Sequence, residues 1–226
     1  MFRKIFLLFL VVGFLGFANT ALAHLPRIVT GDKVVVSNPE VSQAFYGELN
    51  GNPAEYTFTS DRLFDLYVNI LVPEPSNPDG RYSVGIYRLV NGQDEIVATL
   101  PSDSIIWQEI WEEFGRDFYM KGPEFENKQE AAGDYRVVVS SADNKGKYVL
   151  AIGQKEQFIW QEILKVYYIV PLLKLNFFHS SLWQFLLTPF VLFGAMALVS
   201  IFIIIVWFIY LIQKAIKKSR PKSILD

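Results

Sequence analysis

The sequence of 226 residues contains no cysteine and only two histidines, His24 and His179. Without cysteine there can be no disulfide, thiolate metal site, iron–sulfur cluster or thiol nucleophile. The sequence also lacks an Asn-x-Ser/Thr glycosylation acceptor, and an exported eukaryotic domain with neither feature would be unusual. These two absences favour a prokaryotic protein whose exported part folds without covalent cross-links.

The motifs of several common enzyme classes are missing as well. No Ser-His-Asp set, phosphate-binding glycine loop or HExxH motif is present. His24 would become the amino terminus after cleavage behind Ala23, where an α-amine and an imidazole together bind copper(II). Pro26 removes the backbone N–H that such a site deprotonates, and His179 is the only second imidazole. We therefore predict no cofactor and no metal, with metal handling through His24 as the weakest alternative.

Basic residues are scarce in the middle of the chain. The segment 24–182 has 14 Lys and Arg against 22 Asp and Glu, a net charge of −8, whereas the tail 214–226 has a net charge of +4. Nucleic-acid binding needs a basic surface to meet the phosphates. The acidic middle segment therefore excludes nucleic acid as its partner.

The first 23 residues have the three parts of a secretory signal peptide. Arg3 and Lys4 precede an apolar core at residues 5–17, and Ala21-Leu22-Ala23 is a small-x-small cleavage site. The apolar core is shorter than the about 20 residues that a membrane span needs. The sequence predicts that residues 1–23 are removed.

A second apolar segment predicts a transmembrane helix at residues 182–213. No charged residue occurs between Lys174 and Lys214, and Trp183 and Trp207 lie near the two ends of the segment as interfacial aromatics do. Five basic residues follow in the tail 214–226, so the positive-inside rule places the C-terminus in the cytoplasm. We predict a single-pass protein of the cell membrane with its N-terminal domain outside, in contact with membrane lipid.

Between these segments, residues 33–153 show the period of two that is typical of β-strands. The clearest case is 63–72, where Phe64, Leu66, Val68, Ile70 and Val72 share one face and Asp65, Tyr67, Asn69 and Leu71 share the other. The remaining predicted strands are 33–37, 44–49, 56–60, 82–90, 95–100, 135–140 and 148–152. Turn signals separate them, notably Asn91-Gly92. This pattern predicts a mainly β protein, with an antiparallel, jelly-roll-like β-sandwich at residues 24–155.

Two hairpins resemble those of bacterial pre-peptidase C-terminal (PPC-like) β-sandwich domains. The last predicted hairpin, AAGDYRVVVSSADNKGKYVLAIG (131–153), resembles their closing hairpin, and SQAFYGELNGNPAEYTFTSD (42–61) resembles their opening one; together they cover 43 residues. The family's Asp-x-Asp-Leu strand is represented only by Asp65-Leu66, with Leu63 at the first Asp position. The resemblance implies an accessory domain that binds or positions something without catalysis, and it gives no calcium site.

The segment 107–126 is the most unusual part of the domain because it alternates aromatics with acids. Its candidate recognition residues are Trp107, Glu109, Trp111, Glu112, Glu113, Asp117 and Tyr119. Paired carboxylates beside aromatics are found in glycosidases, carbohydrate platforms and cation sites. The alternative is an insertion that interrupts the strand pattern, with its aromatics in the core and its acids in solvent.

The segment 156–181 is predicted to be an amphipathic helix that Pro171 interrupts. It either lies at the outer membrane–water interface or packs under the sandwich.

The function predicted from these features is a non-catalytic binding or scaffolding module of the cell envelope, anchored in the membrane, with an envelope protein or a glycan as partner. The alternative is a membrane-tethered hydrolase of glycans or peptides that acts through 107–126. A pair of carboxylates about 5–9.5 Å apart in one groove would favour the hydrolase.

Overall fold

The computed structural model describes residues 24–157 and 160–219. The predicted signal peptide, 1–23, and the end of the basic tail, 220–226, lie outside these residues. The chain forms two separate compact units, one ending at Thr188 and one beginning at Pro189.

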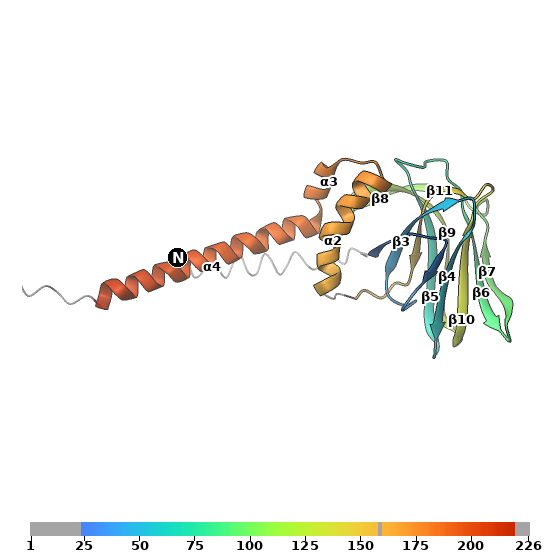
Figure 1. The fold of residues 1–226 in the computed structure, drawn as a ribbon, viewed down its shortest axis with the longest axis horizontal. Coiled ribbons are helices and arrows are strands. Elements are labelled where there is room, and N and C mark those ends of the chain that lie inside the picture. The colour runs from blue at the N-terminus through green and yellow to red at the C-terminus, as the bar shows by residue number, and fades with distance from the viewer. Residues whose placement is uncertain (1–23, 158–159, 220–226) are drawn as a thin grey trace, which may run out of the picture. The chain divides into compact units, whose positions relative to one another are not determined.

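Eleven strands form two sheets in the first unit (Figure 1). The six-stranded sheet has the order β1-β3-β11-β5-β9-β8, and the five-stranded sheet has the order β2-β4-β10-β6-β7. The strands are β1 (Leu25–Ile28), β2 (Lys33–Val35), β3 (Gln43–Asn50), β4 (Ala54–Ser60), β5 (Phe64–Pro73), β6 (Ser83–Val90), β7 (Gln93–Leu100), β8 (Gln108–Glu112), β9 (Asp117–Glu130), β10 (Gly133–Ser140) and β11 (Lys145–Ile152).

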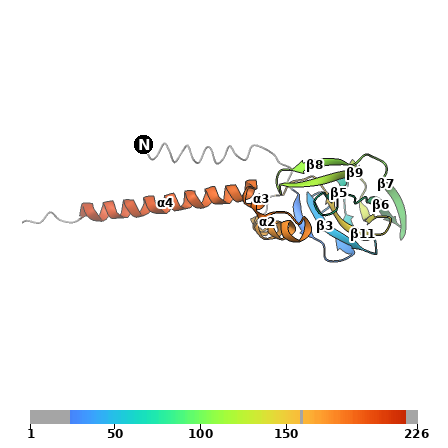
Figure 2. The same ribbon diagram turned by 90° about the horizontal axis from the view of Figure 1, so that it is seen from above.

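The two sheets pack face to face around a shared apolar core, as a sandwich (Figure 2). The chain passes repeatedly from one sheet to the other. Neighbours are antiparallel except β1 beside β3 and β2 beside β4, which are parallel pairs. The predicted fold class is confirmed, and each predicted strand is present close to its expected bounds. The turn between β6 and β7 has positive φ at both Asn91 and Gly92, as a two-residue hairpin of this hand requires.

The core lies between the inner faces of the sheets. Val68 and Ile70 of β5 have no exposed surface, which confirms the predicted inward face of this strand. Two buried hydroxyls, those of Tyr56 and Tyr148, satisfy each other at 2.8 Å. These two hydroxyls are therefore buried without loss of their hydrogen bonding.

One expectation about the segment 107–126 is wrong. It is no insertion outside the strand pattern but the hairpin β8–β9 at the edge of the six-stranded sheet, with Glu112 opposite Asp117 in the register. The strand period is hidden because β9 pairs with β5 through irregularities between Phe64 and Leu66 and between Asn69 and Leu71. Such shifts reverse the in-and-out alternation along a strand.

Three short helical segments follow β11 among the described residues, and the first two cover the outer face of the six-stranded sheet. They are α2 (Trp160–Leu172), the π-helical turn η2 (Leu173–Phe177) and α3 (Leu182–Leu186). The change from α to π follows Pro171, which has no N–H to donate within the helix. A second apolar cluster joins the first two to the sheet, and its buried members are Ala44, Tyr119, Val149, Leu173, Phe177 and Phe178. Of the two predicted locations of this segment, the structure shows packing on the domain.

The second unit contains the helix α4 (Pro189–Ser219). Its part Gly194–Lys217 has a mean hydropathy of 2.8 and is long and apolar enough to cross a membrane. The first residues of the apolar segment that predicted the span form α3 in the other unit.

Candidate functional site

A cavity of about 220 Å³ lies between the outer face of the six-stranded sheet and the helical segments that cover it. Its apolar walls include Ala44, Leu71, Ile110, Val149, Val170, Leu173 and Phe178. Polar side chains enter it from β3, β5 and the β8–β9 hairpin, namely Tyr46, Tyr67, Asn69, Glu112, Asp117, Tyr119 and Lys121. An apolar space with a few convergent polar groups is the usual form of a ligand site.

Asp117, which lines the cavity, belongs to a buried ion pair. The Lys174 Nζ atom of η2 lies 2.8 Å from the Asp117 Oδ1 atom, and neither residue has more than 4% exposed surface. Lys174 also donates to the carbonyl oxygen of Arg116 at 2.8 Å and to the Gln184 Oε1 atom at 3.3 Å. Ser180 donates to Asp117 at 3.2 Å. The ammonium thereby links the β8–β9 turn, η2 and α3 through hydrogen bonds that offset its desolvation.

Burial governs the protonation of both partners. It raises the pKa of Asp117, although the contacts from Lys174 and Ser180 oppose this rise. It lowers the pKa of Lys174, and the contact with Asp117 opposes that change. Because each group is desolvated, the charged forms depend on each other's presence.

Glu112 lies beside this pair, opposite Asp117 in the hairpin register. Its carboxylate accepts hydrogen bonds from the backbone N–H groups of Phe114 at 2.7 Å and Gly115 at 2.6 Å. Desolvation nevertheless raises the pKa of Glu112, and the negative charge of Asp117 adds to this rise. The interior therefore holds two carboxyl groups and one ammonium, so it favours an occupant that brings a cation or a hydrogen-bond donor.

Hydrogen bonds hold the tyrosines of the cavity in place. The hydroxyls of Tyr46 and Tyr119 lie 3.2 Å apart, and burial raises the pKa of both phenols. At the rim, Tyr67 donates to Glu124 at 2.9 Å, and Lys121 pairs with the same carboxylate at 3.1 Å. Since Lys121 is occupied by Glu124, it does not neutralise the carboxyl groups further inside.

Both histidines have hydrogen-bonding partners. His24 lines the cavity, its Nδ1 atom lies 2.7 Å from the Ser42 hydroxyl, and burial lowers its pKa. The His179 Nε2 atom lies 3.1 Å from the Lys147 Nζ atom. Within residues 24–157 and 160–219, no group of three His, Asp or Glu side chains is arranged to hold a metal ion.

The seven predicted recognition residues are distributed over three environments. Glu112, Asp117 and Tyr119 line the cavity. Trp107 is 8% exposed and belongs to the core, where its indole N–H donates to the carbonyl oxygen of Ser102 at 2.7 Å. Trp111, Glu109 and Glu113 are exposed. The hairpin therefore does not present these residues as one continuous surface.

Trp111 has local partners on the hairpin. Its ring lies 4.6 Å from that of Phe118, and the Arg116 guanidinium lies 5.5 Å from its centre.

Lys174, the fully buried partner of the cavity residue Asp117, was not among the predicted site residues. Lys174 was treated only as the boundary of an uncharged segment, although a single lysine in an apolar context is the signal of a buried partner. Asn69 was assigned to the outer face of β5, but nothing in its neighbourhood along the chain indicates that α2 and η2 would cover it. It is 3% exposed and donates to the carbonyl oxygens of Gly122 and Pro123, each at 3.3 Å.

No family model matches the sequence, and no curated protein matches it. Among solved structures, the chain is similar to the pre-peptidase C-terminal domain of collagenase from Bacillus anthracis, with 13% identity over 55% of this chain and 96% of that one and a TM-score of 0.33. It is also similar to PliG of Aeromonas hydrophila, a periplasmic inhibitor of g-type lysozyme, with 15% identity over 57% and 97% of the two chains and a TM-score of 0.36. A β-glucosidase from Paenibacillus barengoltzii shares 16% identity over 57% of this chain and 13% of its own, with a TM-score of 0.22.

All three identities are below 25% and all three TM-scores are below 0.5, so the two sheets of the chain itself define its fold. The domain is thus a β-sandwich of two sheets packed around one apolar core.

Proposed function

We propose that this protein is a membrane-anchored, extracytoplasmic binding module of the cell envelope, and that its ligand enters the cavity on the outer face of the six-stranded sheet. The ligand is a small molecule, or a side chain of an envelope partner, with an apolar body and a cationic or hydrogen-bond-donating group. The observation that carries the proposal is the cavity of about 220 Å³, where Glu112 and Asp117, the partner of the buried Lys174, lie among apolar walls.

Binding is favoured over catalysis because the carboxylates of the cavity already have intramolecular partners. Asp117 is neutralised by Lys174 and accepts from Ser180, so it is a poor nucleophile or base. Glu112, with its raised pKa, has the property of a general acid. A hydrolase is therefore the second candidate. It would require a second catalytic carboxylate beside Glu112, and the neighbouring Asp117 is already paired with Lys174.

Anchoring is supported by the length and hydropathy of α4 and by the basic residues that follow it in the sequence. With the tail in the cytoplasm, protease added outside spheroplasts should digest the β-sandwich and spare a tag at the C-terminus. Digestion of the tag from outside would contradict this topology.

The cavity is tested by filling it. Ala44 of β3 is 5% exposed and lines the cavity, so Ala44→Leu places a larger side chain there. Val35→Phe on β2 is the control, because Val35 is 82% exposed on the other sheet. Envelope partners captured by full-length protein should be lost with Ala44→Leu and retained with Val35→Phe, while both variants keep a cooperative thermal transition.

A further variant, Glu112→Gln, distinguishes binding from hydrolysis. Glu112→Gln keeps the shape of the side chain and removes its charge. A binding role predicts weaker capture of a cationic ligand without any turnover in the native protein. Hydrolysis of an envelope glycan or peptide by the native protein that Glu112→Gln abolishes would instead establish the enzyme.

A further inference from the structure

The helix α3 turns a polar residue toward the domain and apolar residues toward the outside, which is the opposite of a helix on a water-exposed surface. Gln184 turns toward the domain, where its Oε1 atom accepts from the buried Lys174 ammonium at 3.3 Å. The residues that turn away from the domain are apolar, with exposed fractions of 43% for Leu182, 75% for Trp183 and 46% for Leu186, and Leu187 follows at 55%. A surface helix in water normally shows the opposite arrangement.

A second apolar row lies on α2. Leu164 and Tyr168, one turn apart, are 68% and 70% exposed. Val166 and Val170 of the same helix are each 6% exposed, and Val170 lines the cavity. This helix is therefore apolar toward the sheet and also apolar along part of its outer surface.

Charge is nearly absent from these outer faces. The segment from Trp160 to Thr188 contains three charged residues, of which Glu162 pairs with Arg27 at 2.5 Å and Lys174 is fully buried. Lys165 also pairs with Glu162, at 2.9 Å, but its side chain is 56% exposed, so this cation can still be attracted by anionic headgroups.

The position of α3 in the chain indicates what covers it. Pro189, the first residue of α4, is three positions beyond Leu186, so the span of chain between them is about 10 Å at most. If α4 enters the bilayer, α3 lies within that distance of the point of entry. Exposed leucines with tryptophan and tyrosine are the residues that prefer the boundary between headgroups and acyl chains.

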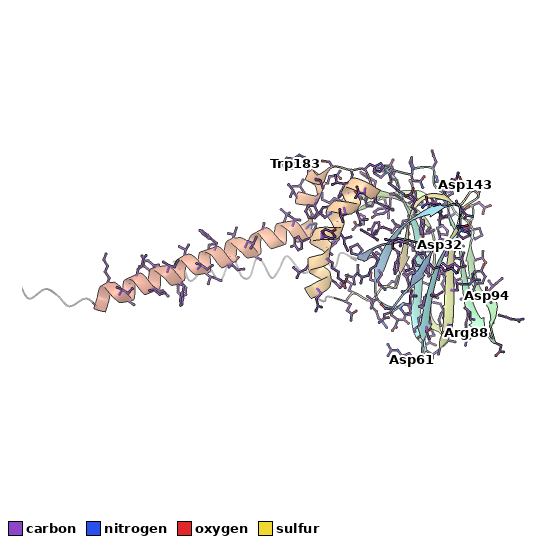
Figure 3. The ribbon with its side chains drawn as sticks, viewed as in Figure 1. Asp32, Asp61, Arg88, Asp94, Asp143 and Trp183 are labelled. Atoms are coloured by element: carbon purple, nitrogen blue, oxygen red, sulfur yellow. The ribbon has the colours of Figure 1, made fainter. Side chains whose placement is uncertain are left out.

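We infer that the exposed residues of α2 and α3 form a lipid-docking face, made of Leu164, Tyr168, Leu182, Trp183, Leu186 and Leu187, that lies in the headgroup region of the outer leaflet. The inference rests on the membrane anchoring in the proposed function and is independent of the ligand. Figure 3 shows Trp183 at the opposite end of the domain from Asp94 on β7, so the face is confined to one end. Because α2 also roofs the cavity, a bound ligand lies within about one helix diameter, 10 Å, of the headgroups.

The absence of native cysteine allows single nitroxide labels on the full-length protein in lipid nanodiscs of phosphatidylcholine and phosphatidylglycerol. The test positions are Leu186→Cys and Tyr168→Cys. Ile96→Cys is the aqueous control, since Ile96 is 67% exposed on β7, and Val206→Cys on α4 is the lipid control. Collisions of each label with oxygen, which partitions into lipid, and with a water-soluble nickel chelate are measured by electron paramagnetic resonance.

The expected result is an oxygen-to-nickel collision ratio at both test positions that is severalfold above that of Ile96→Cys and below that of Val206→Cys. Water-like ratios at either test position, with a lipid-like ratio at Val206→Cys, would overturn the docking face and leave the anchor intact. Low access to both reagents at the test positions would also overturn it, because a protein rather than lipid would then cover the face. A water-like ratio at Val206→Cys would instead remove the anchoring on which the inference rests.

Discussion

The six-stranded sheet has two covered faces, and they are built differently. Its inner face meets the other sheet in an apolar core where Leu66, Val68 and Ile70 have no exposed surface. Its outer face meets a short α-helix and a π-helical turn, and there the same strand β5 contributes Tyr67, Asn69 and Leu71 to a cavity that mixes apolar and polar side chains. Both faces are therefore buried. They differ in how closely their side chains pack and in how many of those side chains are polar.

The difference follows from the shapes of the covering elements. Two twisted sheets of similar size interdigitate along all their strands and leave few voids. A helix of 13 residues covers only part of a six-stranded sheet, so space remains beside it. In that space the charged groups Lys174 and Asp117 persist because they satisfy each other. The packed inner face provides stability, and the outer face has room for a ligand.

Adjacent residues of β5 test this comparison most directly. Val68→Asp places an unpaired carboxylate in the apolar core, at a cost of several kcal/mol, comparable with the about 5–15 kcal/mol that stabilise a whole domain. We expect no folded protein by circular dichroism. Asn69→Asp replaces a donor that two carbonyl oxygens use, and should cost about 1–3 kcal/mol.

The strand period alone, which places Asn69 on the face opposite Val68, would predict little effect of Asn69→Asp, but Asn69 is only 3% exposed. Equal losses at Val68 and Asn69 in thermal unfolding would show that the two faces do not differ as described.

Breaking the buried ion pair tests the outer face. Lys174→Met leaves the Asp117 carboxylate buried without its partner and should lower the free energy of unfolding by about 3–5 kcal/mol. Adding Asp117→Leu removes the unpaired charge and should restore most of this loss. The control is Lys165→Met, at a lysine side chain that is 56% exposed, with an expected change of about 1 kcal/mol or less. A double variant no more stable than Lys174→Met alone would contradict the pairing.

Substitution of two tryptophans that are four positions apart, Trp107 and Trp111, compares the core with the surface. Trp107→Ala empties a site that Gly122 and Ile70 adjoin, so we expect a loss of about 3–5 kcal/mol. Trp111→Ala removes only the contacts with Phe118 and Arg116 and should cost about 0.5–1.5 kcal/mol. Chemical denaturation of both variants measures the two losses. Comparable losses would mean that Trp111 is part of the core.

The smallest effect is expected at an ion pair close to solvent. Lys155, followed by Arg62, lowers the pKa of Glu40 to about 2, although burial of the carboxylate opposes this. Because the folded pKa is below the usual value of about 4.3, Glu40 contributes stability above pH 4.3 and loses it as the pH falls toward 2.

Glu40→Gln should therefore be less stable than the native protein at neutral pH, and the difference should shrink between pH 4.3 and 2. Thermal unfolding across this range measures it, with Glu109→Gln as the control for loss of one exposed acid. A difference that does not depend on pH would refute the role of the ion pair.

Much of the architecture could be predicted because it is encoded locally. The alternation in β5, the Asn91-Gly92 turn and the two PPC-like hairpins each depend on neighbouring residues, and all predicted the sandwich correctly. The hairpin β8–β9 could not be recognised in this way. Only β9 has strands on both sides, and its pairing with β5 is irregular, so the period of two is lost along it.

The candidate site shows the same limit. Glu112, Asp117 and Tyr119 were selected by composition, yet composition could not separate them from Trp107 or Trp111, which lie in other environments. The sequence by itself determined most of the strands, the apolar helix and the charge of each segment, since these depend on residues close together in the chain. Only the tertiary structure decided that η2 brings Lys174 to Asp117, 57 positions away, because a buried charge is stable only where the fold brings its partner to it.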